Sequence, residues 1–139
     1  MIIADTGYWV ALFNRADRHH ARARTVSQAL RERLVTTWPV LTEVTHLLVW
    51  RGHGELARRF LERCFTGAVE VFDLDDEARP RVTELMRRYA ALPMDLADAS
   101  LVILAERLGH GRILSTDRRD FESYRWKNRH PFENLLLEA

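Results

Sequence analysis

Short apolar segments alternate with longer amphipathic segments along this chain. Four of the short ones read as buried or half-buried strands, because they are apolar or β-branched and are bounded by turn residues. These strands are predicted at Met1–Ala4, Leu34–Thr37, Val69–Phe72 and Arg112–Ser115. Strands that alternate with helices pair in parallel, with the helices covering both faces of the sheet. The pattern therefore predicts an α/β fold around a parallel sheet.

The intervening segments show helical periodicity and recognisable ends. Pro39 stands at a first-turn position, and Gly109 follows the most apolar of these segments. The predicted helices are a short turn at Tyr8–Phe13 and longer segments at His19–Leu34, Pro39–Trp50, Glu55–Phe65, Asp75 or Asp76 to Tyr89 or Ala91, and Asp95–Leu108. Beyond the fourth strand the pattern is mixed, and it predicts an extended piece at Tyr124–Trp126 and a further strand at Leu135–Leu137.

Composition narrows the class of protein without identifying it. A chain of 139 residues is long enough for one domain with a real core, so we expect a single domain over residues 1–139. The single cysteine excludes an internal disulfide and a cysteine-based zinc site. The apolar runs are too short for a membrane span and the N-terminus has no basic region before an apolar core, so we expect a cytoplasmic protein.

Four acidic residues fall at positions that a parallel sheet would bring together. Asp5 ends the first strand and Asp117 follows the fourth, while Glu43 and Asp98 lie early in the helices that begin after Thr37 and Pro93. Each has a structural explanation of its own, as a turn residue or as a helix cap. Active sites of such sheets lie beyond the carboxyl ends of the strands. We therefore expect the four carboxylates to converge at one edge.

A cluster of four carboxylates indicates a bound cation. Like-charge repulsion raises the pKa of each member, so the cluster is costly unless a cation holds it. Ligands that are all oxygens suit Mg²⁺ or Mn²⁺, with water completing the coordination. Two further acids are ambiguous. Asp95 is a fifth acid or only the cap of the helix that contains Asp98, and we favour the cap; Asp120 either shares the role of Asp117 or begins the next turn.

The ordered set of motifs resembles the PIN domain in the form of the VapC-type ribonuclease toxins, over essentially the full length. The motifs are Ile2–Trp9, Leu41–Val44, Asp95–Ala99 and Leu114–Phe121. The resemblance implies a PIN-like three-layer α/β/α sandwich with a short, mostly parallel central sheet. It also implies Mg²⁺- or Mn²⁺-dependent hydrolysis of RNA, a cognate antitoxin and a homodimer.

By the same resemblance, Asp5, Glu43, Asp98 and Asp117 are the catalytic and metal-binding acids. Ser115 stands where the family commonly has a threonine that orients the site, and it keeps the hydroxyl. The supporting residues that we expect around the acids are Thr6, Ser115, Asp95 and Asp120. The net charge is only +1, so we expect RNA to be steered by local arginines, namely Arg118, Arg119 and Arg51. Trp9 and Trp50 are candidates for base stacking, although we favour core packing for both.

Other signals point elsewhere, and two other functions stay open. The triplet Asp5-Thr6-Gly7 also occurs in aspartic proteases, but those are β proteins and this pattern is mostly helical. Glu43 and His46 have the spacing of one half of a di-iron site, for which the chain offers no second copy. A catalytically silent PIN-like module that binds RNA or protein remains an alternative. A phosphoacceptor receiver-like domain would need paired early acids and a late lysine, and Lys127 is badly placed for that role.

Overall fold

The core of the molecule is a five-stranded sheet in which every pair of neighbouring strands is parallel. A computed structural model describes residues 1–137. The strand order is β3-β2-β1-β4-β7. The strands are β1 (Ile2–Ala4), β2 (Leu34–Thr37), β3 (Val69–Phe72), β4 (Arg112–Leu114) and β7 (Glu133–Asn134). The four strands predicted from the sequence are confirmed.

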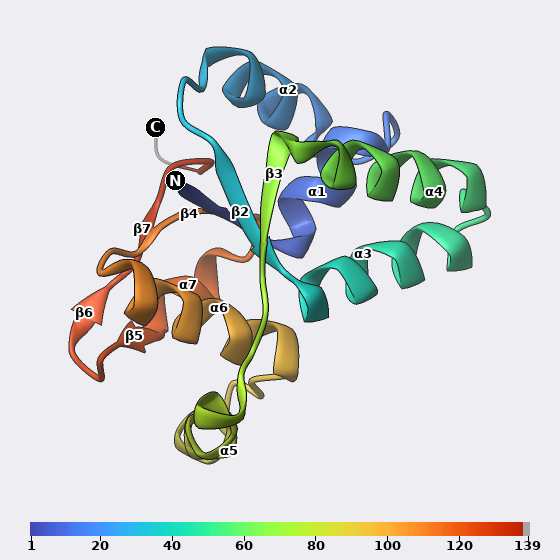
Figure 1. Ribbon diagram of the computed structural model, residues 1–139. Helices are drawn as coiled ribbons and strands as arrows, with labels where there is room; N and C mark the ends of the chain where they lie inside the picture. Colours follow the sequence, from blue (N-terminus) through green and yellow to red (C-terminus); the bar gives the residue numbers. More distant parts are fainter. Residues whose placement is uncertain (138–139) are drawn as a thin grey trace.

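Helices cover both faces of this sheet and make a three-layer α/β/α sandwich, as expected. One face of the sheet is covered by α1 (Thr6–Phe13), α2 (His20–Ala29), α3 (Trp38–Trp50) and α4 (Gly54–Arg63). The other face is covered by α5 (Arg79–Arg88), α6 (Leu96–Leu108) and α7 (Arg118–Ser123) (Figure 1). This division follows from right-handed crossovers, because β1 to β3 advance in one direction across the sheet and β4 and β7 in the other. A π-helical turn (Cys64–Ala68) and a 3₁₀ turn (Asp76–Ala78) flank β3.

The two central strands are buried on both faces. Ile3 and Ala4 in β1, and Ile113 and Leu114 in β4, have no exposed surface. Continuous apolar runs are what a strand between two helical layers requires. Consecutive crossovers leave β1 and β4 toward opposite edges of the sheet, so the carboxyl ends of these two strands form the crevice where α/β proteins bind ligands.

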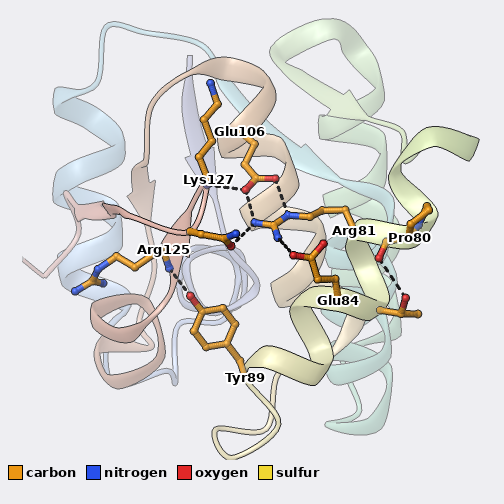
Figure 2. Close-up of polar contacts among 9 residues, drawn as sticks. Pro80, Arg81, Glu84, Tyr89, Glu106, Arg125 and Lys127 are labelled. Carbon is orange, nitrogen blue, oxygen red and sulfur yellow. Dashed lines mark hydrogen bonds and ion pairs between the residues drawn. The ribbon is translucent and has the colours of Figure 1, made fainter.

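A two-stranded antiparallel hairpin follows α7 and is fixed to the helices beside it. It consists of β5 (Arg125–Trp126) and β6 (His130–Pro131). Glu106 of α6 accepts two hydrogen bonds from the Arg81 guanidinium, at 3.1 and 2.7 Å, and one from the Lys127 backbone N–H at 2.6 Å (Figure 2). Such bidentate, largely buried pairs have a fixed geometry, so the hairpin is held against α5 and α6.

The ends of two predicted elements differ most from those expected. The predicted strand at Leu135–Leu137 is wrong: β7 ends at Asn134 and the chain then turns. The Asn134 side-chain oxygen accepts the Leu136 N–H at 3.1 Å, which is the geometry of an Asx turn. The helix predicted to reach Leu34 ends at Ala29, because the backbone leaves the helix at Leu30, and the chain then bends at Glu32 before β2. The arginine-rich sequence there contains no stop signal.

The two tryptophans that were considered for base stacking differ in burial. Trp9 is 3% exposed and packs against Phe60, so the preference for core packing is confirmed. Trp50 is 76% exposed at the end of α3, and core packing is wrong for it. Its position in the last turn of a helix that projects beyond the sheet explains this exposure (Figure 1).

Within the described part of the chain, no helix is both long and apolar enough to cross a membrane. The single domain predicted over 1–139 includes residues 138 and 139, which lie outside the described residues, and it stays a prediction.

Candidate active site

The four predicted acids line one cavity of about 370 Å³ at the carboxyl edge of β1 and β4. Asp5 comes from the end of β1, Glu43 from α3, Asp98 from α6 and Asp117 from the turn after β4. The remaining residues of the lining are Thr6, Gly7, Leu92, Pro93, Asp95, Thr116, Arg119 and Asp120. Segments more than 100 residues apart in sequence therefore supply acids to the same hollow.

Asp5 is the most deeply buried of the four, with 6% of its surface exposed. It is the N-cap of α1, and its Oδ1 accepts the Thr6 backbone N–H at 2.7 Å. Its backbone N–H donates to the Leu114 carbonyl at 3.0 Å, which continues the β1–β4 ladder by one residue. The position of the carboxylate is thus set by both a helix start and the sheet.

Ser115 connects the acids of the two central strands. Its hydroxyl donates to Asp5 Oδ2 at 2.7 Å, and the same oxygen accepts the Asp117 backbone N–H at 3.0 Å. Asn134 of β7 holds Ser115 in turn, through hydrogen bonds of 3.2 Å to its backbone N–H and 2.9 Å to its carbonyl. Ser115 is fully buried and does not itself line the cavity, so it orients the acids through these hydrogen bonds alone.

Asp98 combines a capping role with a place in the cavity. Asp95 is the N-cap of α6 and accepts the Asp98 N–H at 2.8 Å, and Asp98 Oδ2 lies 3.5 Å from the Asp95 N–H, which completes a capping box. The cap expected for Asp95 is confirmed. The Tyr124 hydroxyl donates to Asp98 Oδ2 at 3.1 Å, so a buried tyrosine fixes the direction of this carboxylate.

Glu43 reaches the cavity from α3 and is half-buried between Thr6 and Asp95. The buried Thr6 hydroxyl lies beside Glu43 and lowers the pKa of that carboxyl, against the larger effect of burial. The register of α3 against α6 is set by a 2.7 Å hydrogen bond between the hydroxyls of Thr37 and Ser100, both fully buried. This contact keeps the starts of the two helices, and with them Glu43 and Asp98, on the same side of the crevice.

Asp117 and Asp120 begin α7 together. Asp117 is the N-cap and its Oδ1 accepts the Asp120 N–H at 3.1 Å. Asp120 is 6% exposed and accepts a hydrogen bond of 3.2 Å from Arg119 Nε. Arg119 also donates to the Leu92 carbonyl at 3.2 Å. Among residues 1–137, Arg119 is the one cation that lines the cavity.

The carboxylates of the cavity resist ionisation together. Burial, with smaller contributions from the charges of Glu43 and Asp117, raises the pKa of Asp5 to about 7 despite its two hydrogen bonds. Burial and then the Asp95 and Asp5 charges raise the pKa of Asp98 to about 8. Burial also raises the pKa of Glu43 and of Asp117. Negative charge is thus concentrated here beyond what the single arginine offsets, which is the electrostatic signature of a cation site.

The oxygen ligands of the cavity fit a hard divalent cation, and the spacing of the acids limits how many of them can contact one ion directly. The available ligands are carboxylate oxygens. Among residues 1–137, however, no three acidic, histidine or cysteine side chains are grouped closely enough to hold a metal ion by themselves. The residues therefore fit a partly hydrated ion such as Mg²⁺, which keeps several waters in protein sites.

A glycine allows the first turn of α1 to approach the loop after β4. A Cβ atom on Gly7 would lie 1.8 Å from Thr116 Oγ1 and 3.0 Å from Thr116 Cβ. Only a residue without a side chain permits this contact between the two segments that carry Asp5 and Asp117.

Some predicted residues lie elsewhere, and some important ones were not predicted. Arg118 donates to the Leu137 carbonyl at 3.1 Å and Arg51 follows the far end of α3; neither lines the cavity. Tyr124 and Asn134, which orient Asp98 and Ser115, were not predicted from the sequence. They act from 26 and 19 residues away, and no local motif marks such contacts.

Comparisons with known proteins agree with this geometry. The family model described as PIN domain matches residues 2–127. Ribonuclease VapC26 of Mycobacterium tuberculosis is 27% identical over 124 residues, covering 89% of this chain and 92% of the relative.

Two solved structures share the fold. VapC20 of Mycobacterium tuberculosis, described as a toxin that cleaves the sarcin-ricin loop, superposes with a TM-score of 0.79 at 21% identity, covering 86% of this chain and 92% of that one. A toxin-antitoxin complex from Klebsiella pneumoniae gives a TM-score of 0.64 at 16% identity, covering 88% and 92%. With its sheet order, its acidic crevice and a family match over nearly its whole length, this chain belongs to the PIN domain family.

Proposed function

We propose that this protein is a VapC-type endoribonuclease that hydrolyses phosphodiester bonds in RNA, as the toxin of a toxin–antitoxin pair. The observation that carries the proposal is the convergence of Asp5, Glu43, Asp98 and Asp117 in one cavity at the sheet's switch point. Membership of the PIN family and the resemblance to a protein named Ribonuclease VapC26 support RNA as the substrate.

Mg²⁺ or Mn²⁺ is the cofactor that we propose for this site. Asp5, Asp98 and Asp117 would hold the ion directly or through water, with Glu43 holding a second ion or the attacking water. When bound, such an ion supplies a more acidic water and stabilises the negative charge that develops on a phosphoryl group. Because no three carboxylates are preassembled around one point within the described residues, we propose that water mediates part of the contact.

The surrounding residues position the reacting groups. Ser115 hydrogen-bonds the Asp5 carboxylate and the Asp117 backbone N–H, and Tyr124 hydrogen-bonds the Asp98 carboxylate. These bonds keep the carboxylates of Asp5 and Asp98 directed at the cavity. Glu43 is half-buried beside Asp95, where a raised pKa suits a group that accepts a proton from water. Arg119 is placed to contact a phosphate at the rim, and the proposed steering of RNA rests on it rather than on Arg118 or Arg51.

A cognate antitoxin is the proposed partner, because one structure with this fold is a toxin-antitoxin complex. A homodimer and a location in the cytoplasm are also proposed, on the strength of the family resemblance alone. The second candidate function is a PIN domain that holds RNA without cutting it. The intact set of four acids favours the nuclease.

The deciding experiment is incubation of the purified protein with total RNA and Mn²⁺, beside the Asp5→Asn variant, followed by mapping of new RNA ends. New ends that appear with the wild type and are absent with the variant support the nuclease. Arg59→Gln is a matched control on an exposed face of α4 and should cut as the wild type does. Binding of RNA and Mn²⁺ with no new ends from a broad panel of RNAs would establish the silent module instead.

A further inference from the structure

An open groove of about 540 Å³ lies between the N-terminal halves of α3 and α6, next to the acidic cavity. It shares Glu43 and Asp95 with that cavity, so the two hollows adjoin. The apolar part of its lining consists of Trp38, Pro39, Leu96 and Ala97. A strand of RNA with one phosphate at the acids would therefore have a neighbouring nucleotide within reach of an apolar surface.

Two large apolar side chains in this groove are exposed. Trp38 is the first residue of α3 and Leu96 is the first residue of α6, and each keeps 46% of its surface exposed. Side chains of this kind are mostly covered in a folded domain, and exposed apolar surface rimmed by polar residues marks binding sites. Their place beside the acids points to a group that covers them when RNA is bound.

The Trp38 ring is held in place by its own structure. No residue separates β2 from α3, so the sheet fixes the Trp38 backbone on one side and the helix fixes it on the other. The Thr42 hydroxyl donates to the Trp38 carbonyl at 3.1 Å. The Phe65 ring packs against the indole, with 5.7 Å between ring centroids and 45° between planes. An indole that is already ordered loses little entropy when a flat group stacks on it.

The charges around the acids distinguish the two sides of the site. Glu43 and Asp95 line the groove, and no arginine or lysine in the described chain does, so a phosphate placed there would face carboxylates alone. Arg119, in contrast, lines the acidic cavity from α7. Because α3 follows β2 and α7 follows β4, with β1 and Asp5 between those strands, the groove and Arg119 flank the acids on opposite sides. A phosphate fits the side of Arg119, and an uncharged aromatic group fits the groove.

We propose that this groove binds one unpaired nucleobase of the RNA, stacked on the Trp38 indole and packed against Leu96, while a neighbouring phosphate lies at the acids. The inference rests on the proposed function, and it makes Trp38 a substrate-binding residue of that site. Every base has an aromatic face, so stacking selects an unpaired nucleotide and not a particular base. The groove thus favours cleavage within single-stranded segments.

Binding can be measured apart from cleavage in the Asp98→Asn variant with Mn²⁺. The probes are a fluorescein-labelled single-stranded RNA dodecamer of mixed sequence and an abasic ribose-phosphate chain of the same length and charge. Anisotropy titrations should show tighter binding of the RNA than of the abasic chain. Addition of Trp38→Ala should weaken binding of the RNA about tenfold, the loss of one base–aromatic stack, and leave the abasic chain unchanged. Trp38→Phe should keep most of the affinity.

Two further variants separate the groove from other apolar surface. Trp50→Ala removes an exposed indole about 18 Å further along α3, outside the groove, and should bind both probes as the parent does. Leu96→Gln changes the other helix of the groove and should weaken binding of the RNA alone, which keeps the proposal testable if Trp38→Ala does not fold. Equal losses for the RNA and the abasic chain, or equal losses in Trp38→Ala and Trp50→Ala, would overturn the proposal. A change from dimer to monomer in Trp38→Ala, measured by light scattering, would overturn it too, because the groove would then join two copies of the chain.

Failure of this inference and failure of the nuclease give different results. With Asp98 intact, Trp38→Ala should cut single-stranded RNA with kcat/KM lowered about tenfold. If RNA is cut but the affinity for the RNA dodecamer does not depend on Trp38, the base site is wrong and the nuclease stands. If no RNA is cut but the preference for RNA over the abasic chain still depends on Trp38, the nuclease is wrong and the base site stands.

Discussion

The Ser115 hydroxyl donates a 2.7 Å hydrogen bond to the buried carboxylate of Asp5, across 110 residues of sequence. The same oxygen accepts the Asp117 N–H, so one atom ties the carboxyl ends of the two central strands together. The acids of the crevice therefore depend on a hydroxyl that does not itself line it.

Removal of this hydroxyl should impair catalysis more than folding. Ser115→Ala leaves Asp5 Oδ2 without its donor and frees the Asp117 loop, so we expect RNA cleavage to fall by about tenfold or more, as is typical when a group that orients a ligand is lost. Ser115→Thr keeps the donor and should retain most activity. Initial rates at saturating Mn²⁺ check this, and equal rates for Ala and Thr variants would show that the hydrogen bond is dispensable.

Asp98→Asn should abolish cleavage while leaving the protein folded. The substitution removes a carboxylate that is disfavoured by burial and by the charges of Asp95 and Asp5. In metal-free buffer at pH 8 we expect the melting temperature to stay the same or to rise. A fall of many degrees would mean that the cap of α6, rather than the charge cluster, dominates the role of this residue.

Stability without metal should decrease as pH rises. The folded-state pKa values of Asp5 and Asp98, about 7 and about 8, lie above the ordinary value of 3.8, so both groups contribute stability below about pH 4 that is lost as pH rises through their folded pKa values. One such group changes the free energy of unfolding by at most about 1.4 kcal/mol per pH unit. Urea unfolding between pH 5 and 8 in EDTA should show a shallower slope for Asp98→Asn than for the wild type.

A divalent ion should reverse this loss. Millimolar Mn²⁺ at pH 8 should raise the melting temperature, because the ion binds the folded cluster in preference to the unfolded chain. The increase should shrink in Asp5→Asn and be unchanged in Arg59→Gln. Identical melting curves with Mn²⁺ and with EDTA would contradict a cation site in this crevice.

The contact between Gly7 and Thr116 should not tolerate a side chain. In Gly7→Ala the new Cβ would overlap Thr116 Oγ1, so α1 or the loop before Asp117 must move. We expect a lower melting temperature, by several degrees, together with a large loss of cleavage. Adding Thr116→Ala removes the closest atom and should restore part of the stability. No recovery in the double variant would place the strain elsewhere.

The local sequence pattern was sufficient to predict the order of the strands and helices and the acids that line the cavity. Ile2–Ala4 and Arg112–Leu114 could be recognised because strands buried on both faces must be continuously apolar. Helix starts at Trp38 and Leu96 could be recognised because Pro39 and Asp95 act on the residues next to them. Where a local signal was missing or was overruled by distant contacts, as at Ala29 and at Leu135–Leu137, the predicted boundary was wrong.

What the sequence determined by itself is the α/β class and the set of carboxylates, because periodicity, caps and strand ends are properties of neighbouring residues. What only the tertiary structure decided is how those carboxylates are held. Ser115 donates to Asp5 from 110 residues away, and Tyr124 donates to Asp98 from 26 residues away. Asn134 supports Ser115 from a strand that was predicted two to three residues too late. Contacts of this kind arise from packing between elements, and packing leaves no periodic trace in a single chain.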